Sequence, residues 1–133
     1  MAFGSEGIDV TYRCATDLST KQYYAVYLSG NHTVALAGAN AKVVGILQNK
    51  PDGTAGESAL VRIMGLSKHV MGEASLTVGD VLTSTAAGKG EQADAAGEWV
   101  YGVITDSGDN TIADGDVATI QLIGGAAAHA SDA

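Results

Sequence analysis

One cysteine and three histidines are the side chains of this chain that could bind a transition metal or pair a nucleophile with a base. They are Cys14, His32, His69 and His129. A structural zinc site needs several such ligands at short, recurring spacings, and these four are scattered along the sequence without one. We therefore predict no metal site, and the single cysteine excludes an intrachain disulfide.

The stretch richest in oxygen donors covers residues 106–116, DSGDNTIADGD. A calcium loop of the EF-hand type places donors at alternate positions and ends on a glutamate that binds through both oxygens. Here Gly108 occupies the third position and no glutamate closes the loop. Because Asp, Asn and Gly are also the residues that turns prefer, we interpret this stretch as a hairpin loop.

The common sequence patterns of catalytic sites are absent. The chain has no Gly-x-Ser-x-Gly elbow, phosphate loop or dinucleotide fingerprint. Gly88-Lys89-Gly90 lacks the preceding glycine and the following hydroxyl residue of a phosphate loop. Ser67 and Lys68 are adjacent, so on a strand their side chains point to opposite faces. We predict a protein that is not an enzyme and that has no catalytic residue and no cofactor.

Charge and hydropathy narrow the classes of partner. The chain has 15 acidic and 7 basic residues, a net charge of −8, and most of the acidic residues lie in its second half. Nucleic-acid binding requires the opposite sign, so we predict no nucleic-acid partner. The charge favours solubility, with attraction to a basic partner surface as the alternative. No apolar run reaches the length of a membrane span and the start lacks a signal-peptide layout, so we expect no membrane contact and synthesis in the cytoplasm.

The elements that organise the chain are two copies of one β-hairpin. Residues 43–65 read VVGILQNKPDGTAGESALVRIMG, and residues 100–124 read VYGVITDSGDNTIADGDVATIQLIG. Both begin Val-x-Gly, cross a polar loop, resume with glycine and an acid, and end in a strand closed by glycine. The difference in length lies in the loop, where insertions cost least. Strand–turn–strand segments precede both copies, so the predicted repeat covers 25–65 and 80–124.

Short alternating apolar runs, 18 glycines and the absence of a helical period predict an all-β fold. We expect one pseudo-symmetric β domain over residues 21–124, built from two similar β units. Residues 1–20 fit neither copy and predict an extended N-terminal arm. Residues 125–133 predict a short flexible C-terminal tail.

Apolar side chains on the expected outer faces of strands are candidates for an interface. Tyr23 and Tyr27 alternate with Tyr24, Val26 and Leu28, and we assign the aliphatic set to the core and the two tyrosines to an interface. In the repeated hairpins the inward set begins with Ala59, Val61 and Ile63. The opposite faces are half apolar and predict cover by a second layer or a neighbouring subunit; their apolar members are Leu60, Met64, Val117 and Ile123.

The order of these motifs resembles that of tailed-phage capsid cement or decoration proteins, a family of small β-rich proteins that stabilise phage heads. The resemblance runs from about Gln22 to Gly124. Besides the two hairpins, it rests on the link Met64-Gly-Leu-Ser-Lys68 and on Leu76-Thr-Val-Gly-Asp80-Val-Leu-Thr-Ser84. It implies a compact β-barrel or β-tulip-like protein that assembles as a homotrimer. Its partner would be the major capsid protein, bound on the outer capsid surface of the virion where coat subunits meet, and it would hold the shell against internal genome pressure.

Within that resemblance the arm is the expected coat-binding element. We predict that Phe3, Ile8, Val10 and Tyr12 order on the coat protein by strand addition. A β-rich module that binds host glycans is the alternative function, with Tyr23, Tyr27 and Trp99 as candidate contacts. A small enzyme of the β-clip type would need clustered polar loop residues, and the sequence shows none.

Overall fold

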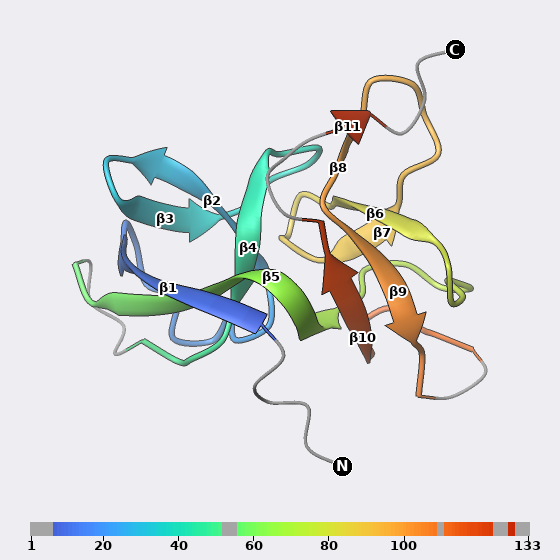
Figure 1. The fold of residues 1–133 in the computed structure, drawn as a ribbon, viewed down its shortest axis with the longest axis horizontal. Helices are drawn as coiled ribbons and strands as arrows, with labels where there is room; N and C mark the ends of the chain where they lie inside the picture. Colours follow the sequence, from blue (N-terminus) through green and yellow to red (C-terminus); the bar gives the residue numbers. More distant parts are fainter. Residues whose placement is uncertain (1–6, 52–55, 109–110, 124–127, 130–133) are drawn as a thin grey trace.

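The computed structural model describes residues 7–51, 56–108, 111–123 and 128–129, and within them the chain is all-β (Figure 1). The fold class predicted from the sequence is confirmed. No helix in these ranges is long and apolar enough to cross a membrane. The strands are β1 (Gly7–Cys14), β2 (Ala25–Gly30), β3 (Thr33–Leu36), β4 (Val43–Leu47), β5 (Ser58–Val70), β6 (Val81–Ser84), β7 (Gly90–Gln92), β8 (Trp99–Val100), β9 (Gly102–Asp106), β10 (Val117–Leu122) and β11 (Ala128–His129).

The first five strands form a closed barrel, which we call unit 1 (residues 7–63). Its strand order is β1-β3-β2-β4-β5, and β1 also pairs with β5 in antiparallel register, which closes the barrel. The β1–β3 seam is the short one, with two parallel residue pairs, Arg13 with Thr33 and Cys14 with Val34. In Figure 1 this unit lies on the left, with β1 alongside the first half of β5.

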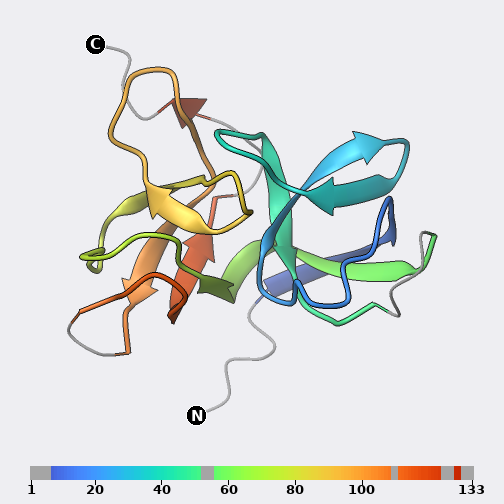
Figure 2. The same ribbon diagram turned by 180° about the vertical axis from the view of Figure 1, so that it is seen from behind.

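The second half of β5 leaves unit 1 and becomes the first strand of unit 2 (residues 64–122). There Gly65–Val70 pairs with β10, and β10 is followed by β9, β6 and β7. An isolated parallel bridge between Met71 and Gly90 joins β7 back to the start of the unit. Unit 2 therefore repeats the strand order of unit 1, and Figure 2 shows the two units side by side with β5 passing between them.

Backbone hydrogen bonds show that the repeat is longer than its sequence signal. Cys14 N donates to Glu57 O and Gly56 N to Cys14 O, both at 2.8 Å; Met71 N donates to Asp116 O at 2.7 Å and Gly115 N to Met71 O at 2.8 Å. Four further pairs of bonds match in the same way: Ala15–Val34 with Gly72–Gly90, Tyr23–Leu47 with Gly79–Ile104, Ala37–Ala25 with Ala93–Val81, and Leu47–Tyr24 with Ile104–Asp80. β1 thus corresponds to the second half of β5, and residues 7–20 belong to unit 1.

This arrangement differs from the predicted arm of residues 1–20. Ile8, Val10 and Tyr12 lie in β1, which supplies the closing strand of unit 1, whereas Phe3 lies outside the described residues. The physical reason is that the other four strands of unit 1 would leave the edge of β5 unpaired, and β1 satisfies those backbone groups. In the predicted tail, Ala128–His129 pairs with β8 in antiparallel register.

The assignment of the strand after residue 22 was partly wrong. Ala25 and Val26 are both fully buried, because Val26 faces the interior of unit 1 while Ala25 faces unit 2. Leu28, assigned to the core, is 48% exposed near the β2–β3 turn. Tyr27 packs against the buried cluster shared by the two units instead of standing free. The contact between the units makes both faces of β2 apolar at its start, which a simple alternation cannot represent.

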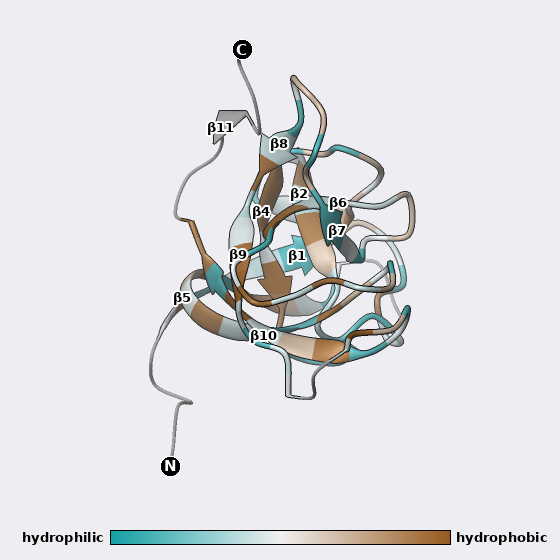
Figure 3. Cartoon of the chain, turned by 90° about the vertical axis from the view of Figure 1, so that its right-hand side faces the viewer, coloured by the Kyte–Doolittle hydropathy of each residue, from teal (hydrophilic) through white to brown (hydrophobic). Residues whose placement is uncertain are grey.

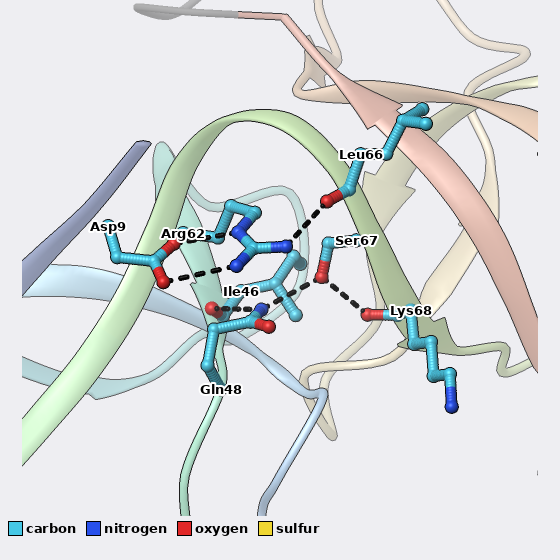
Figure 4. A network of polar contacts seen from close by, with 7 residues as sticks. All are labelled: Asp9, Ile46, Gln48, Arg62, Leu66, Ser67 and Lys68. Atoms are coloured by element: carbon cyan, nitrogen blue, oxygen red, sulfur yellow. Dashed lines mark hydrogen bonds and ion pairs between the residues drawn. The ribbon is translucent and has the colours of Figure 1, made fainter. Parts of the chain in front are cut away.

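A polar network fixes β5 at the point where it passes from one unit to the other (Figure 4). Arg62 donates from Nε and Nη2 to the two carboxylate oxygens of Asp9, at 2.7 and 3.1 Å, and from Nη1 to the carbonyl of Leu66 at 3.0 Å. Gln48 Nε2 donates to Ile46 O and to Ser67 Oγ. The Arg62 and Asp9 side chains are 13% and 25% exposed, so this bidentate pair is only partly shielded from solvent; it ties β1 and both halves of β5 together.

Replacing Arg62 with methionine is expected to lower the free energy of unfolding by about 2 kcal/mol, because it leaves the Asp9 carboxylate and the Leu66 carbonyl without their donor. Methionine keeps an apolar stem of similar length, so the loss reports on the polar contacts. Denaturant unfolding measures it. Asp9→Asn is the matched control and should lose about half as much, because the bond to Leu66 remains. A variant Arg62→Met as stable as the original chain would contradict the proposed tie.

Candidate protein-interaction surfaces

Three large apolar side chains on neighbouring strands form one exposed group, which we call the apolar patch: Ile8, Met64 and Ile123. They are 53%, 45% and 44% exposed. Ile8 is the register partner of Met64, and Leu122 is the partner of Gly65, so continued register brings Ile123 level with Met64. The patch therefore lies where the start of β1, the middle of β5 and the end of β10 meet. Exposed apolar groups of this kind mark interaction sites more often than isolated apolar residues do.

Val117 and Tyr23 belong to a second surface at the opposite end of β10. Six residues separate Val117 from Ile123, a distance of roughly 20 Å along a strand. Val117 is 46% exposed and lines an open pocket of about 400 Å³ whose other walls are Tyr23, Lys68, Asp106, Gly108, Ala118 and Thr119. The Lys68 ammonium lies 5.8 Å from the centre of the Tyr23 ring. The predicted interface residues are thus divided between two surfaces.

The other residues predicted to contact a partner are less exposed to solvent. Tyr27 packs partly buried against the cluster shared by the units, and Tyr12 packs against the interior of unit 1. Val10 and Leu60 are also partly buried. Of the aromatic side chains proposed for glycan binding, Tyr23 lines the pocket described above, whereas Trp99 lies under the ammonium of Lys42, 4.8 Å from its ring centre. The structure does not bring Tyr23, Tyr27 and Trp99 together in that pocket.

His69 is fully buried between the units and is a structural residue that sequence reasoning left unassigned. Its Nδ1 lies 2.8 Å from the carbonyl oxygen of Tyr23, and its Nε2 contacts the hydroxyl of Tyr101. Because a carbonyl only accepts, Nδ1 carries the proton and Nε2 accepts from the tyrosine. Burial lowers the pKa of His69 to about 4, against a smaller opposing effect of the Tyr23 carbonyl. Burial also raises the pKa of Tyr101 well above its usual value.

The acidic loop binds its own backbone. Asp106 Oδ1 accepts from Gly108 N and Asp116 Oδ2 from Ala113 N, each at 2.9 Å, which is the local capping expected of turn residues. Asp114 forms an ion pair with Lys89 at 3.2 Å. Among the described residues, no group of three or more His, Cys, Asp or Glu side chains could hold a metal ion. Cys14 is buried, and burial, followed by Glu57 and Asp17, raises its pKa above the usual thiol value.

These features define a class of protein: a closed five-stranded β-barrel followed by a second β unit of the same strand order, with exposed apolar groups on the outside. No protein-family model matches the chain, and no curated protein matches it in sequence. Among solved structures, the chain is similar to the N-terminal base of the head fiber protein gp8.5 of bacteriophage phi29, with a TM-score of 0.60 and 18% sequence identity. The match covers 87% of this chain and 93% of that chain. At this identity the likeness shows a shared fold.

Proposed function

We propose that the chain is a structural protein of a phage virion that binds the outer surface of the head and stabilises the shell. The observation that carries this proposal is the fold shared with a phage head fiber base over nearly the full length of both chains. The sequence resemblance to capsid decoration proteins supports it independently, because it rests on motif order within residues 22–124. No group of side chains in the described residues suggests a competing catalytic role.

The mechanism is a linkage effect. A protein that binds assembled coat subunits and not separated ones adds its binding free energy to the shell alone. A protein that stabilises the shell in this way needs no catalytic turnover; it needs only a rigid fold and a contact surface. The two packed units supply the rigid body, since their shared buried cluster includes Ala25 and Ile46 of unit 1 and Met71, Leu82 and Ile104 of unit 2. As a homotrimer the protein would bind through several linked contacts at once, which raises its effective affinity.

The apolar patch is the proposed contact with the major capsid protein. Ile8 and Met64 lie in β1 and β5, and Ile123 directly follows β10, so all three are exposed apolar side chains on or next to strands that the fold holds in place. Ile8 follows shortly after Phe3, so residues 1–6 would extend the same contact along the coat. Val10 and Tyr12 act within unit 1 and support β1, so the proposed strand addition is restricted to the residues before β1.

A triple variant Ile8→Ser, Met64→Ser and Ile123→Ser tests the patch. It removes exposed apolar area, so the fold should persist while affinity for the coat falls. We expect the original chain to cosediment with empty expanded shells of the phage that encodes it, and the variant to bind at least about tenfold more weakly. Circular dichroism and thermal unfolding confirm that the variant is folded.

The matched control is Val117→Ser, since Val117 is as exposed as the patch residues but lies at the other end of β10. It should bind shells like the original chain. Loss of binding in this control with retention in the triple variant would move the contact to the pocket beside Tyr23. Failure of the original chain to bind shells, or to raise their resistance to heating, would contradict the proposed function itself.

A further inference from the structure

Among the contacts between the two units, one is made by a short segment of unit 1 that enters a seam in unit 2. In unit 2 the seam lies between the second half of β5 and the turn before β7. Tyr23 O accepts from Val70 N at 3.1 Å, and Ala25 N donates to Gly88 O at 2.8 Å, so residues 23–25 of unit 1 bridge the two sides. Ala25 and Ile46, which are register partners, are fully buried by this contact.

Unit 2 presents the corresponding segment on its own outer side. Residues 79–81 correspond to 23–25, because Gly79 N donates to Ile104 O as Tyr23 N donates to Leu47 O. Val81 is the register partner of Val103 as Ala25 is of Ile46. Gly79 is exposed, Val81 and Val103 are half-buried, and the neighbouring Val78 is 57% exposed. Figure 3 views the molecule from this side, with unit 2 in front.

Unit 1 presents the corresponding seam, in a closed form. Arg13 and His32 stand where Val70 and Gly88 stand in unit 2, and Arg13 N donates directly to His32 O at 3.0 Å. The β1–β3 pairing holds only two residue pairs, so opening the seam at its His32 end breaks this bond and leaves the rest of the barrel closed. Opening the seam therefore gives up this one hydrogen bond and the contact of the His32 ring with Tyr12, whose ring centres lie 4.9 Å apart.

We propose that two copies of this chain associate head to tail, with residues 79–81 of one copy inserted between Arg13 and His32 of the next. Arg13 N–H then donates to Gly79 O of the first copy, and Val81 N–H donates to His32 O. One backbone bond is exchanged for two, and the Val81–Val103 pair becomes buried as Ala25 and Ile46 are within one chain. This inference rests on the self-association included in the proposed function and names its surfaces.

Charge favours the same pairing. Residues 7–63 carry five basic and four acidic residues, whereas residues 64–123 carry two basic and nine acidic ones. Contact between two copies of unit 2 would bring like charges together, while contact between unit 2 and unit 1 of the next copy would not. Such a heterologous contact presents different surfaces on the two sides and can close into a ring.

One difference between the two seams predicts a variant that binds more tightly. At Gly88 the φ of 78° favours glycine, and a Cβ atom would lie 2.5 Å from Leu36 Cδ1 and 3.3 Å from the carbonyl oxygen of Ala25. His32 occupies the equivalent position with a φ of 52°, which also favours glycine. His32→Gly should therefore strengthen association several-fold, whereas Val81→Asp should weaken it at least about tenfold by burying an unpaired charge.

Sedimentation velocity on the full chain, its His32→Gly and Val81→Asp variants, and a Val117→Asp control measures these effects. The control adds the same charge at Val117, an exposed valine away from the proposed contact, and should leave association unchanged. A mixture of Val81→Cys and His32→Cys chains gives the orientation: oxidation should yield a covalent dimer between the two variants, more readily than within either variant alone, and Cys14 is buried and should not compete.

An original chain that stays monomeric at high micromolar concentration, a Val117→Asp variant that loses association while Val81→Asp retains it, or crosslinking between identical variants in preference to the mixture would overturn the inference. The outcome is separate from that for shell binding. A chain that remains monomeric yet cosediments with shells would contradict only the head-to-tail contact. A chain that self-associates but does not bind shells would contradict only the proposed shell-binding function.

Discussion

Replacing Gly45 with alanine is expected to lower the free energy of unfolding by about 3 kcal/mol, at the upper end of the cost of overpacking. A Cβ atom at Gly45 would lie 2.7 Å from Val61 Cγ1 and closer still to the carbonyl oxygen of Arg62. The obstruction is backbone of the adjacent strand, so no side-chain rotation relieves it. Guanidinium-induced unfolding measures the loss, which is a large fraction of the stability of a typical domain.

Two other glycines calibrate this result. Gly102 is the equivalent residue of unit 2, where a Cβ atom would meet Gln121 O and Ile120 Cδ1 at 3.1 Å, so Gly102→Ala should cost about 1 kcal/mol. Gly38 has no neighbouring atom within 4 Å of a Cβ position, and Gly38→Ala should change stability by less than about 0.5 kcal/mol. If all three variants have the same stability, close strand approach is not the reason for the repeated Val-x-Gly motif.

Acid is expected to destabilise the chain through His69. In the folded chain the pKa of His69 lies at about 4, whereas the same side chain in the unfolded chain titrates near its ordinary value of 6.5. Above pH 6.5 the ring is neutral in both states and the full stability is present. As the pH falls from 6.5 toward 4, the unfolded chain binds a proton that the folded chain excludes, so stability falls. The total loss from this residue by pH 4 is about 3 kcal/mol.

Chemical unfolding at pH 7, 6, 5 and 4 tests this expectation. A His69→Gln variant should be less stable than the original chain at pH 7, because its amide fits the Tyr23 carbonyl and the Tyr101 hydroxyl less well. Its stability should nevertheless fall less between pH 6.5 and pH 4, since the titrating group is gone. His32→Gln makes the same substitution at an exposed turn position and is the matched control for the loss of stability at pH 7. An equal decline in the original chain and in His69→Gln would show that other groups cause it.

The internal repeat illustrates how far the sequence alone leads. The hairpins of residues 43–65 and 100–124 were predicted from matched motifs, and the structure pairs Leu47 with Val61 and Ile104 with Ile120 at equivalent positions. Those motifs can be recognised in the sequence because the neighbouring strand comes very close at Gly45 and Gly102, so both copies need glycine at that position. β1 and the second half of β5 have no such demand, so GIDVTYRC and its counterpart GLSKHVM carry no visible similarity. Their correspondence appears only in their hydrogen bonds.

For the candidate surfaces too, the sequence predicted part of the result and the structure supplied the rest. Met64, Val117 and Ile123 were predicted as outer apolar residues, and each is between 44% and 46% exposed. That they form two surfaces at opposite ends of β10, and that Ile8 joins one of them, depends on register between strands far apart in sequence. No local pattern records register across a closed barrel.

By itself, the sequence determined the all-β class, the repeated hairpins and the absence of recognisable catalytic motifs, because alternation, turn residues and ligand spacing are local properties of a chain. Only the tertiary structure decided that residues 7–14 close the first barrel, that His69 is buried between the units, and which apolar side chains remain outside. Those outcomes depend on pairing one segment with another that the chain brings to it from a distance. Backbone hydrogen bonds form between peptide groups whatever their side chains are, so the sequence does not show which segments they join.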